Sequence, residues 1–170
     1  IVKHNFNQLG INNINCLCGD SIEILKKYNQ QFDCIYIDPS RRNDSKGKVF
    51  MLADCSPNVV ELQNFYYQFT DTLLIKTAPI LDLHAGLLEL KNVAEIHIVA
   101  IDNEVKEVLW KIEKEFIGSP KIFAINIEKE NVITSEIRTN KDYKATYSLP
   151  KKFLYEPNAS LLKSGRFEAV

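Results

Sequence analysis

Short apolar runs alternate with amphipathic stretches along the first three quarters of the chain. Several of the runs end at glycine, proline or asparagine, which favours strands over buried helices. This alternation is typical of an α/β domain with a mostly parallel sheet and right-handed crossovers. We expect strands at residues 14–18, 32–37, 72–76, 94–101 and 121–127.

Apolar residues at helical spacing predict a helix beside most of these strands. Asp20 followed by Glu23 resembles a capping box, and Ser56-Pro57 suits the cap and first position of a later helix. We expect helices at residues 1–10, 22–28, 57–69, 80–90 and from about residue 103. In the last of these, one apolar face would be lined by Val105, Val108, Leu109, Ile112 and Phe116.

The pattern changes after residue 128. Residues 132–139 and 143–149 suit a hairpin around Asn140-Lys141-Asp142, and a short helix is expected at 160–163. We therefore divide the chain at this point, with one α/β domain over residues 1–128 and a second region over 129–170.

Composition narrows the class of protein. The chain has 170 residues, 45% of them hydrophobic, and a net charge of −1, which indicates a globular domain without an overall basic field. Residues 41–48 and 141–170 each carry a local charge of +3, which suits either phosphate or a solvated loop. No apolar run reaches the ~20 residues that span a bilayer, so we expect no membrane partner.

The cysteines indicate neither a metal site nor a disulfide framework. There are four, without a CxxC pair, and three lie on expected strands. Buried, reduced thiols in a cytoplasmic protein are the expected state. We therefore expect no metal ligands.

The stretch Cys34–Arg42 is the strongest candidate for a site. Its apolar run ends abruptly in Asp38, a proline and two arginines. Pro39 would stop the strand, and the carboxyl end of a strand in an open α/β sheet faces the ligand crevice. A simple strand end followed by a basic loop is the plainer interpretation.

The order of four passages resembles class I S-adenosylmethionine-dependent methyltransferases, in particular the bacterial group with a C-terminal THUMP-like domain. The passages are residues 36–42, 75–82, 103–107 and 154–159, which read YIDPSRR, IKTAPILD, NEVKE and LYEPNA. The resemblance implies a partial Rossmann-like three-layer sandwich, followed by a β-hairpin and the beginning of a small α+β domain.

Two features of that family do not occur in the sequence. They are the glycine-rich turn that holds the methionine end of the cofactor and the acid that holds its ribose. We therefore expect this chain to be the carboxyl-side part of a longer protein and to be inactive alone. A complementary N-terminal segment or chain would then pair with the unpaired strand.

The resemblance also implies roles for individual residues. Asp38 and Pro39 would be catalytic: the carboxylate and a backbone carbonyl accept hydrogen bonds from the amino group of a flipped-out base and aim its nitrogen at the methyl group. Asp38 would also lie beside S-adenosyl-L-methionine, whose adenine end would contact Gly19, Asp20, Ser21 and Ile22.

Substrate contacts are expected from the residues that follow Asp38 and from the end of the next strand. The family usually has a second proline and an aromatic residue after the first proline, whereas this chain has serine and arginine. An arginine plane can stack on a base and hold phosphate. The candidate contacts are Ser40, Arg41, Arg42 and Lys76.

The expected partner is RNA, either tRNA or rRNA, by analogy with the appended domain. An Asp-Pro-x-Arg pattern also occurs in uridine C5-methyltransferases, but their cysteine nucleophile would fall at Thr77-Ala78-Pro79, and Cys55 comes too early. Two other functions stay open. One is a non-catalytic RNA-binding module, and the other is a nucleotide-binding α/β enzyme that uses Asp38 as a metal ligand or base.

Overall fold

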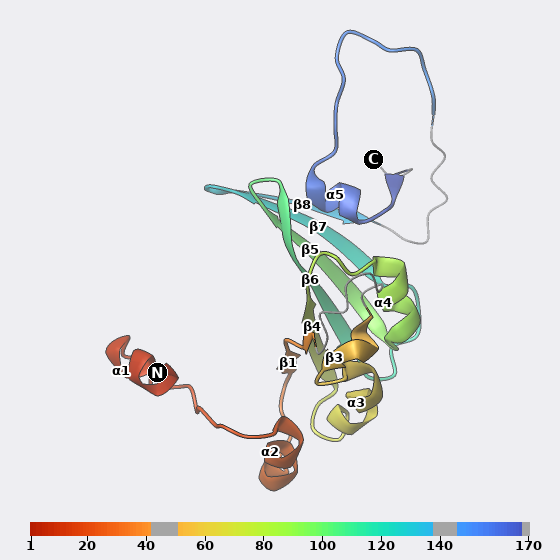
Figure 1. The fold of residues 1–170 in the computed structure, drawn as a ribbon. Coiled ribbons are helices and arrows are strands. Elements are labelled where there is room, and N and C mark those ends of the chain that lie inside the picture. The colour runs from red at the N-terminus through yellow and green to blue at the C-terminus, as the bar shows by residue number, and fades with distance from the viewer. Residues whose placement is uncertain (42–50, 138–145, 168–170) are drawn as a thin grey trace. The chain divides into compact units, whose positions relative to one another are not determined.

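A computed structural model of the protein describes residues 1–41, 51–137 and 146–167 (Figure 1). The chain divides into two compact units, Ile1–Gln31 and Phe32–Val170. Each unit is described by itself below.

The first unit contains two short helices. They are α1 (Val2–Gln8) and α2 (Ser21–Tyr28). Gly10, at a φ of 69°, follows the end of α1 as expected from its freedom to adopt positive φ. Asp20 caps α2 by accepting hydrogen bonds from the amides of Ile22 and Glu23, at 2.9 and 3.2 Å, so its predicted cap is confirmed.

The strand expected at residues 14–18 is not formed. Ile14 and Leu17 are 49% and 55% exposed, and within this unit no strand lies beside them to supply ladder hydrogen bonds. A strand needs such a partner, whatever the apolar character of its residues.

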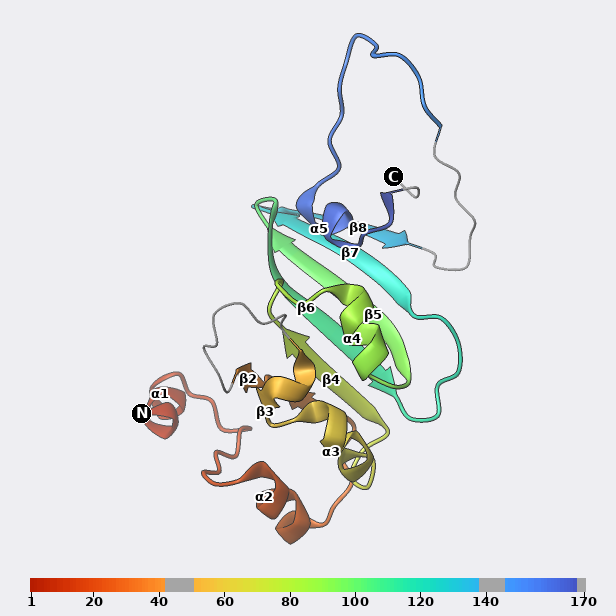
Figure 2. The same ribbon diagram turned by 45° about the vertical axis from the view of Figure 1, so that its right-hand side comes forward.

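The second unit is built on a six-stranded mixed sheet with the order β1-β4-β6-β5-β7-β8 (Figure 2). Among the described residues, β1/β4 and β5/β7 pair in parallel, whereas β4/β6, β5/β6 and β7/β8 are antiparallel. The expectation of a mostly parallel sheet is therefore wrong. The strands are β1 (Ile35–Ile37), β4 (Thr72–Thr77), β5 (Val93–Ile101), β6 (Glu104–Glu113), β7 (Lys121–Glu128) and β8 (Asn131–Ile137).

Strand β6 replaces the helix expected from about residue 103. Val108, Trp110 and Ile112 are all fully buried and alternate with half-buried residues, which is the two-residue period of a strand. Asp102 and Asn103 have φ values of 47° and 61°, which suits the tight turn of a hairpin between β5 and β6. The helical spacing was misleading because apolar residues occupy both faces of this strand.

The hairpin at the end of the sheet is also shifted along the chain. Strand β8 pairs with β7, with Glu128 opposite Asn131, so the turn lies at residues 129–130. The expected turn at Asn140-Lys141-Asp142 lies outside the described residues, and residues 146–149 form no strand.

In the part of this unit that the structure describes, three helices and a short 3-10 turn accompany the sheet, with α3 and α4 in front of it in Figure 2. Asn58, and not Ser56, caps α3: its side chain accepts from the amides of Val60 and Glu61, and the Ser56–Pro57 bond before it is cis. The elements are η1 (Leu52–Asp54), α3 (Val59–Tyr66), α4 (Leu83–Glu89) and α5 (Ala159–Lys163).

Trp110 is the centre of the core. Its indole is fully buried, and Nε1 donates to Oγ1 of Thr77 at 2.9 Å. Gly86 of α4 lies directly on the ring, since a Cβ there would be only 2.4 Å from Cη2. Tyr66 and Phe69 are also buried, so these aromatic side chains belong to the core.

Two hydrogen bonds join α5 to two of the passages that carry the family resemblance. Asn103 Oδ1, in the β5–β6 turn, accepts from the amide of Ala159 at the start of α5, at 2.7 Å. Lys163, at the end of α5, donates to the carbonyl of Leu81 at 2.8 Å. Burial lowers the pKa of Lys163, although the charge of Asp82 opposes that effect. These contacts give residues 103 and 158–163 a structural role.

The cysteines differ from the expectation of buried thiols. Cys55 is buried, Cys16 is half-buried, and Cys18 and Cys34 are exposed. Cys34 immediately precedes β1 at the edge of the sheet, and Cys18 lies in the segment where the expected strand does not form.

Across the residues that the structure describes, no helix combines the length and the apolar character needed to cross a membrane.

Candidate active site

Asp38 and Lys76 meet where two parallel strands end. Strand β1 pairs with β4 so that Ile37 lies opposite Ile75. The residues that follow these two in the chain are Asp38 and Lys76. Lys76 Nζ lies 2.8 Å from Asp38 Oδ2. The sequence placed both side chains at this edge, and the structure joins them in an ion pair.

Glu107 reaches the same edge from the other side of β4. Strand β6 runs antiparallel to β4 with Val108 opposite Thr77, so Glu107 lies just beyond the end of β4. Lys76 Nζ is 3.8 Å from Glu107 Oε1. We call Asp38, Lys76 and Glu107 the Asp38 cluster.

The electrostatics of the cluster favour a charged lysine. The hydrogen bond to Asp38 raises the pKa of Lys76; desolvation opposes this, and the charges of Asp38 and Glu107 add to it. Burial and then the charge of Asp38 raise the pKa of Tyr36, on the strand that precedes the cluster. With two carboxylates and one ammonium, the cluster has a net charge of −1 at neutral pH.

The two described ends of the segment that follows Pro39 pair with each other. Ser40–Arg41 forms β2, which pairs with β3 (Cys55–Ser56), and Ser40 Oγ donates to the carbonyl of Ser56 at 3.3 Å. Arg42 lies outside the described residues. Cys55 is 1% exposed, which agrees with the argument against a cysteine nucleophile here.

Glu89 secures the return of this segment to the sheet. Its carboxylate accepts from the amides of Leu52 and Ala53, at 2.8 and 3.0 Å. Leu52 is fully buried. The C-terminal end of α4 therefore fixes the position of η1 before β3 begins.

The candidate cofactor residues Gly19, Asp20, Ser21 and Ile22 lie in the first unit. There Asp20 serves as the cap of α2, and Gly19 has a φ of 151°. Asp38, the remaining candidate, lies in the second unit. The two groups are thus described separately.

Sequence reasoning missed Glu107 and Glu89. Glu107 fell within the helix expected from about residue 103, whereas in the structure it lies on β6. The alternation of Val108, Trp110 and Ile112 was the available signal for a strand. Nothing local marks Glu89, because its partners are 36 and 37 residues away in sequence.

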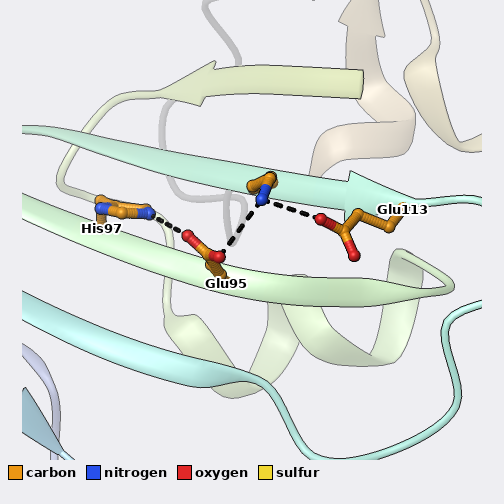
Figure 3. A network of polar contacts seen from close by, with 4 residues as sticks. Glu95, His97 and Glu113 are labelled. Atoms are coloured by element: carbon orange, nitrogen blue, oxygen red, sulfur yellow. Dashed lines mark hydrogen bonds and ion pairs between the residues drawn. The ribbon is translucent and has the colours of Figure 1, made fainter. Parts of the chain in front are cut away.

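A second polar network lies on the sheet (Figure 3). The register places it on the face that bears Lys76, because Lys76 lies opposite Leu109 and Leu74 lies opposite Lys111. Glu95 contacts His97 Nε2 at 2.8 Å and accepts from Lys111 at 3.2 Å, and Lys111 also pairs with Glu113 at 2.8 Å. The His97 ring stacks on Phe123, with centroids 4.8 Å apart. Burial raises the pKa of Glu95, but the hydrogen bonds from His97 and Lys111 outweigh it, so the net pKa is below its usual value.

We expect this network to make stability depend on acidity. The pKa of Glu95 is lower in the folded than in the unfolded protein. Its contribution to the free energy of unfolding is therefore fully present above the unfolded pKa of about 4.5 and is lost as pH falls through the folded pKa. Urea unfolding of wild type and Glu95→Gln between pH 7 and 3 tests this. The stability difference between them should shrink on acidification, and a difference that is constant with pH would contradict the assignment.

Comparison with known proteins adds an independent observation. No family model and no curated protein matches the sequence. Among solved structures, the chain is similar to the crystal structure of a putative methyltransferase from Porphyromonas gingivalis W83, with a TM-score of 0.76 and 32% sequence identity. The match covers 96% of this chain and 42% of that one. The chain therefore spans less than half the length of that protein and shares the fold of the matching segment.

Proposed function

We propose that this protein takes part in methyl transfer from S-adenosyl-L-methionine to a base of RNA, either tRNA or rRNA. One observation carries the proposal: Asp38, in an Asp-Pro sequence, ends a parallel strand inside a segment that matches a putative methyltransferase over 96% of this chain.

Asp38 would orient the acceptor. Its carboxylate accepts a hydrogen bond from the exocyclic amino group, the backbone carbonyl beside Pro39 accepts a second, and the nitrogen lone pair is thereby aimed at the methyl group. The cofactor would supply an electrophilic methyl group: the nitrogen would bond to the methyl carbon as the bond from that carbon to the positively charged sulfur breaks, S-adenosylhomocysteine would leave, and the nitrogen would lose one proton to solvent. The net charge of −1 on the Asp38 cluster suits both this cation and an N–H donor.

The first unit would hold the adenine end of the cofactor. Asp20 bonds the amides of α2 through Oδ1, and a carboxylate has a second oxygen with which it can accept from an adenine amino group. Gly19, Ser21 and Ile22 would lie beside the ring. A complementary N-terminal segment or chain would supply the remaining contacts and pair with β1.

RNA is the preferred substrate because the segment that precedes α5 exposes aromatic and basic side chains. Tyr147, Phe153 and Tyr155 are 94%, 65% and 85% exposed. Lys152 Nζ lies 5.3 Å from the centroid of the Phe153 ring. Aromatic faces stack on unpaired bases and lysines meet phosphate. Ser40, Arg41 and Arg42 would add contacts near the target base.

On this proposal, the region 129–170 contains the beginning of a THUMP-like RNA-binding domain. The cytoplasm is the compartment that an RNA substrate implies for a bacterial protein. An enzyme of this kind also needs its target base unpaired or flipped out of a stack.

Isothermal titration of S-adenosylhomocysteine into the full-length protein tests the cofactor. We expect binding at one site, weakened about tenfold or more by Asp20→Ala, since one charge-assisted hydrogen bond contributes about 1.5–3 kcal/mol. The exposed Asp33 provides a matched control, and Asp33→Ala should bind as the wild type does. If the wild type does not bind S-adenosylhomocysteine and its activity depends on a divalent ion, the result would instead favour a nucleotide-binding α/β enzyme that uses Asp38 as a metal ligand or base.

A further inference from the structure

Lys76 lies between two carboxylates in the Asp38 cluster. Its Nζ is 2.8 Å from Asp38 and 3.8 Å from Glu107. The lysine side chain is 25% exposed, whereas those of Asp38 and Glu107 are 52% and 47% exposed. The lysine is thus the least exposed member of the group.

We propose that Lys76 is a positioning residue that fixes the Asp38 carboxylate for methyl transfer, and that Glu107 holds Lys76 in place. This inference rests on the proposed function, because it concerns the group that would orient the acceptor nitrogen. It differs from a phosphate contact by Lys76, since both neighbours of the ammonium group are already anionic.

The need for such a residue follows from the location of Asp38. This side chain follows the last residue of an edge strand and is half-exposed, so without a partner it can sample several rotamers. Methyl transfer requires the nitrogen, the methyl group and the sulfur in line. A misplacement of about 1 Å can slow such a reaction about 10²-fold.

The sheet itself fixes the lysine. Lys76 is the penultimate residue of β4; β6 pairs with it through Leu109, and β1 pairs with Ile75, the residue before it. The same pairing brings in Glu107. Because an ammonium group has three donors, it can serve both carboxylates at once. Asp38 then binds Lys76 with Oδ2 and can accept from the target amino group with its other oxygen.

Removing the positive charge would also leave two carboxylates without their common partner. The two like charges would then repel each other, and Asp38 would turn toward water. The lysine therefore contributes by holding Asp38 and not by touching the substrate.

Steady-state methyl transfer by the full-length protein distinguishes these roles, with tritiated S-adenosylmethionine and in vitro transcribed tRNA and rRNA as probes. For Lys76→Met we expect kcat to fall about 10- to 100-fold, with less than about a threefold change in KM for the RNA. Lys76→Arg should recover most of kcat, because guanidinium also bonds carboxylates. Glu107→Gln should lower kcat less, because Asp38 would still be paired.

Lys106→Met is the matched control. Lys106 lies on β6 one residue before Glu107 and pairs with Glu104 at 2.6 Å, so its removal should leave kcat unchanged. An unchanged kcat in Lys76→Met, or a rise confined to KM for the RNA, would overturn the positioning role alone. Absence of transfer by the wild type would overturn the proposed function, and the positioning role with it.

Discussion

Replacement of Asp38 by alanine should lower methyl transfer by about 10²–10³-fold, the loss typical of one preorganised polar group removed from a reacting centre. The substitution removes the acceptor that would orient the target nitrogen. It also leaves Lys76 with Glu107 as its remaining partner in the cluster, 3.8 Å away. Asp38→Asn should lose less activity, because the amide keeps one oxygen acceptor.

The fold should survive this change. The Asp38 side chain is 52% exposed, and surface substitutions usually alter the free energy of unfolding by less than about 0.5 kcal/mol. Asp33 is exposed and lies before β1, whereas Asp38 follows it. Asp33→Ala serves as the control and should transfer methyl groups at the wild-type rate. Activity of Asp38→Ala within about threefold of the wild type would contradict the role assigned to Asp38.

The largest loss of stability is expected from Trp110→Ala, about 3–5 kcal/mol in the free energy of unfolding. The indole is fully buried between the sheet and α4, and its Nε1 is the donor to Thr77 Oγ1. The substitution leaves a cavity and removes that hydrogen bond. Urea unfolding followed by circular dichroism measures the loss without depending on tryptophan fluorescence.

Gly86→Ala provides a matched test of the same contact. Alanine favours a helix over glycine by about 1 kcal/mol, but a Cβ at residue 86 would lie 2.4 Å from the ring. Overpacking of this kind typically costs about 1–3 kcal/mol, and the ring is too enclosed to move, so a net loss is expected. In the Trp110→Ala background the penalty should vanish. An equal penalty in both backgrounds would contradict the contact.

Sequence analysis succeeded where the signal is local. The strands around Tyr36, Leu74, Ile98 and Ala124 were predicted within one to three residues, because apolar runs with clear stops define them. The cap at Asp20 was predicted because its hydrogen bonds reach only three residues along the chain.

It failed where partners distant in sequence decide the structure. Strand β6 is a strand because β4 and β5 flank it on both sides, and no window of its own residues contains that information. Residues 14–18 have the composition of a strand but no neighbour in their unit. From the apolar pattern alone, β6 was predicted to be a helix and residues 14–18 a strand.

The candidate site shows the same division. Asp38 and Lys76 were each recognised from the strand end that they follow, but their ion pair depends on the register of β1 and β4. Glu107 could not be added to the site until β6 was known to be a strand. The central claim therefore rests on geometry as well as on the Asp-Pro sequence.

The most direct measurement of that claim is the transfer of tritium from methyl-labelled S-adenosylmethionine to unmodified tRNA and rRNA by the full-length wild-type protein, with the product digested to nucleosides and identified by mass spectrometry. The account predicts label in one nucleoside, methylated on an exocyclic amino nitrogen, and its loss in Asp38→Ala. Label on a carbon atom, or label that persists in Asp38→Ala, would contradict it.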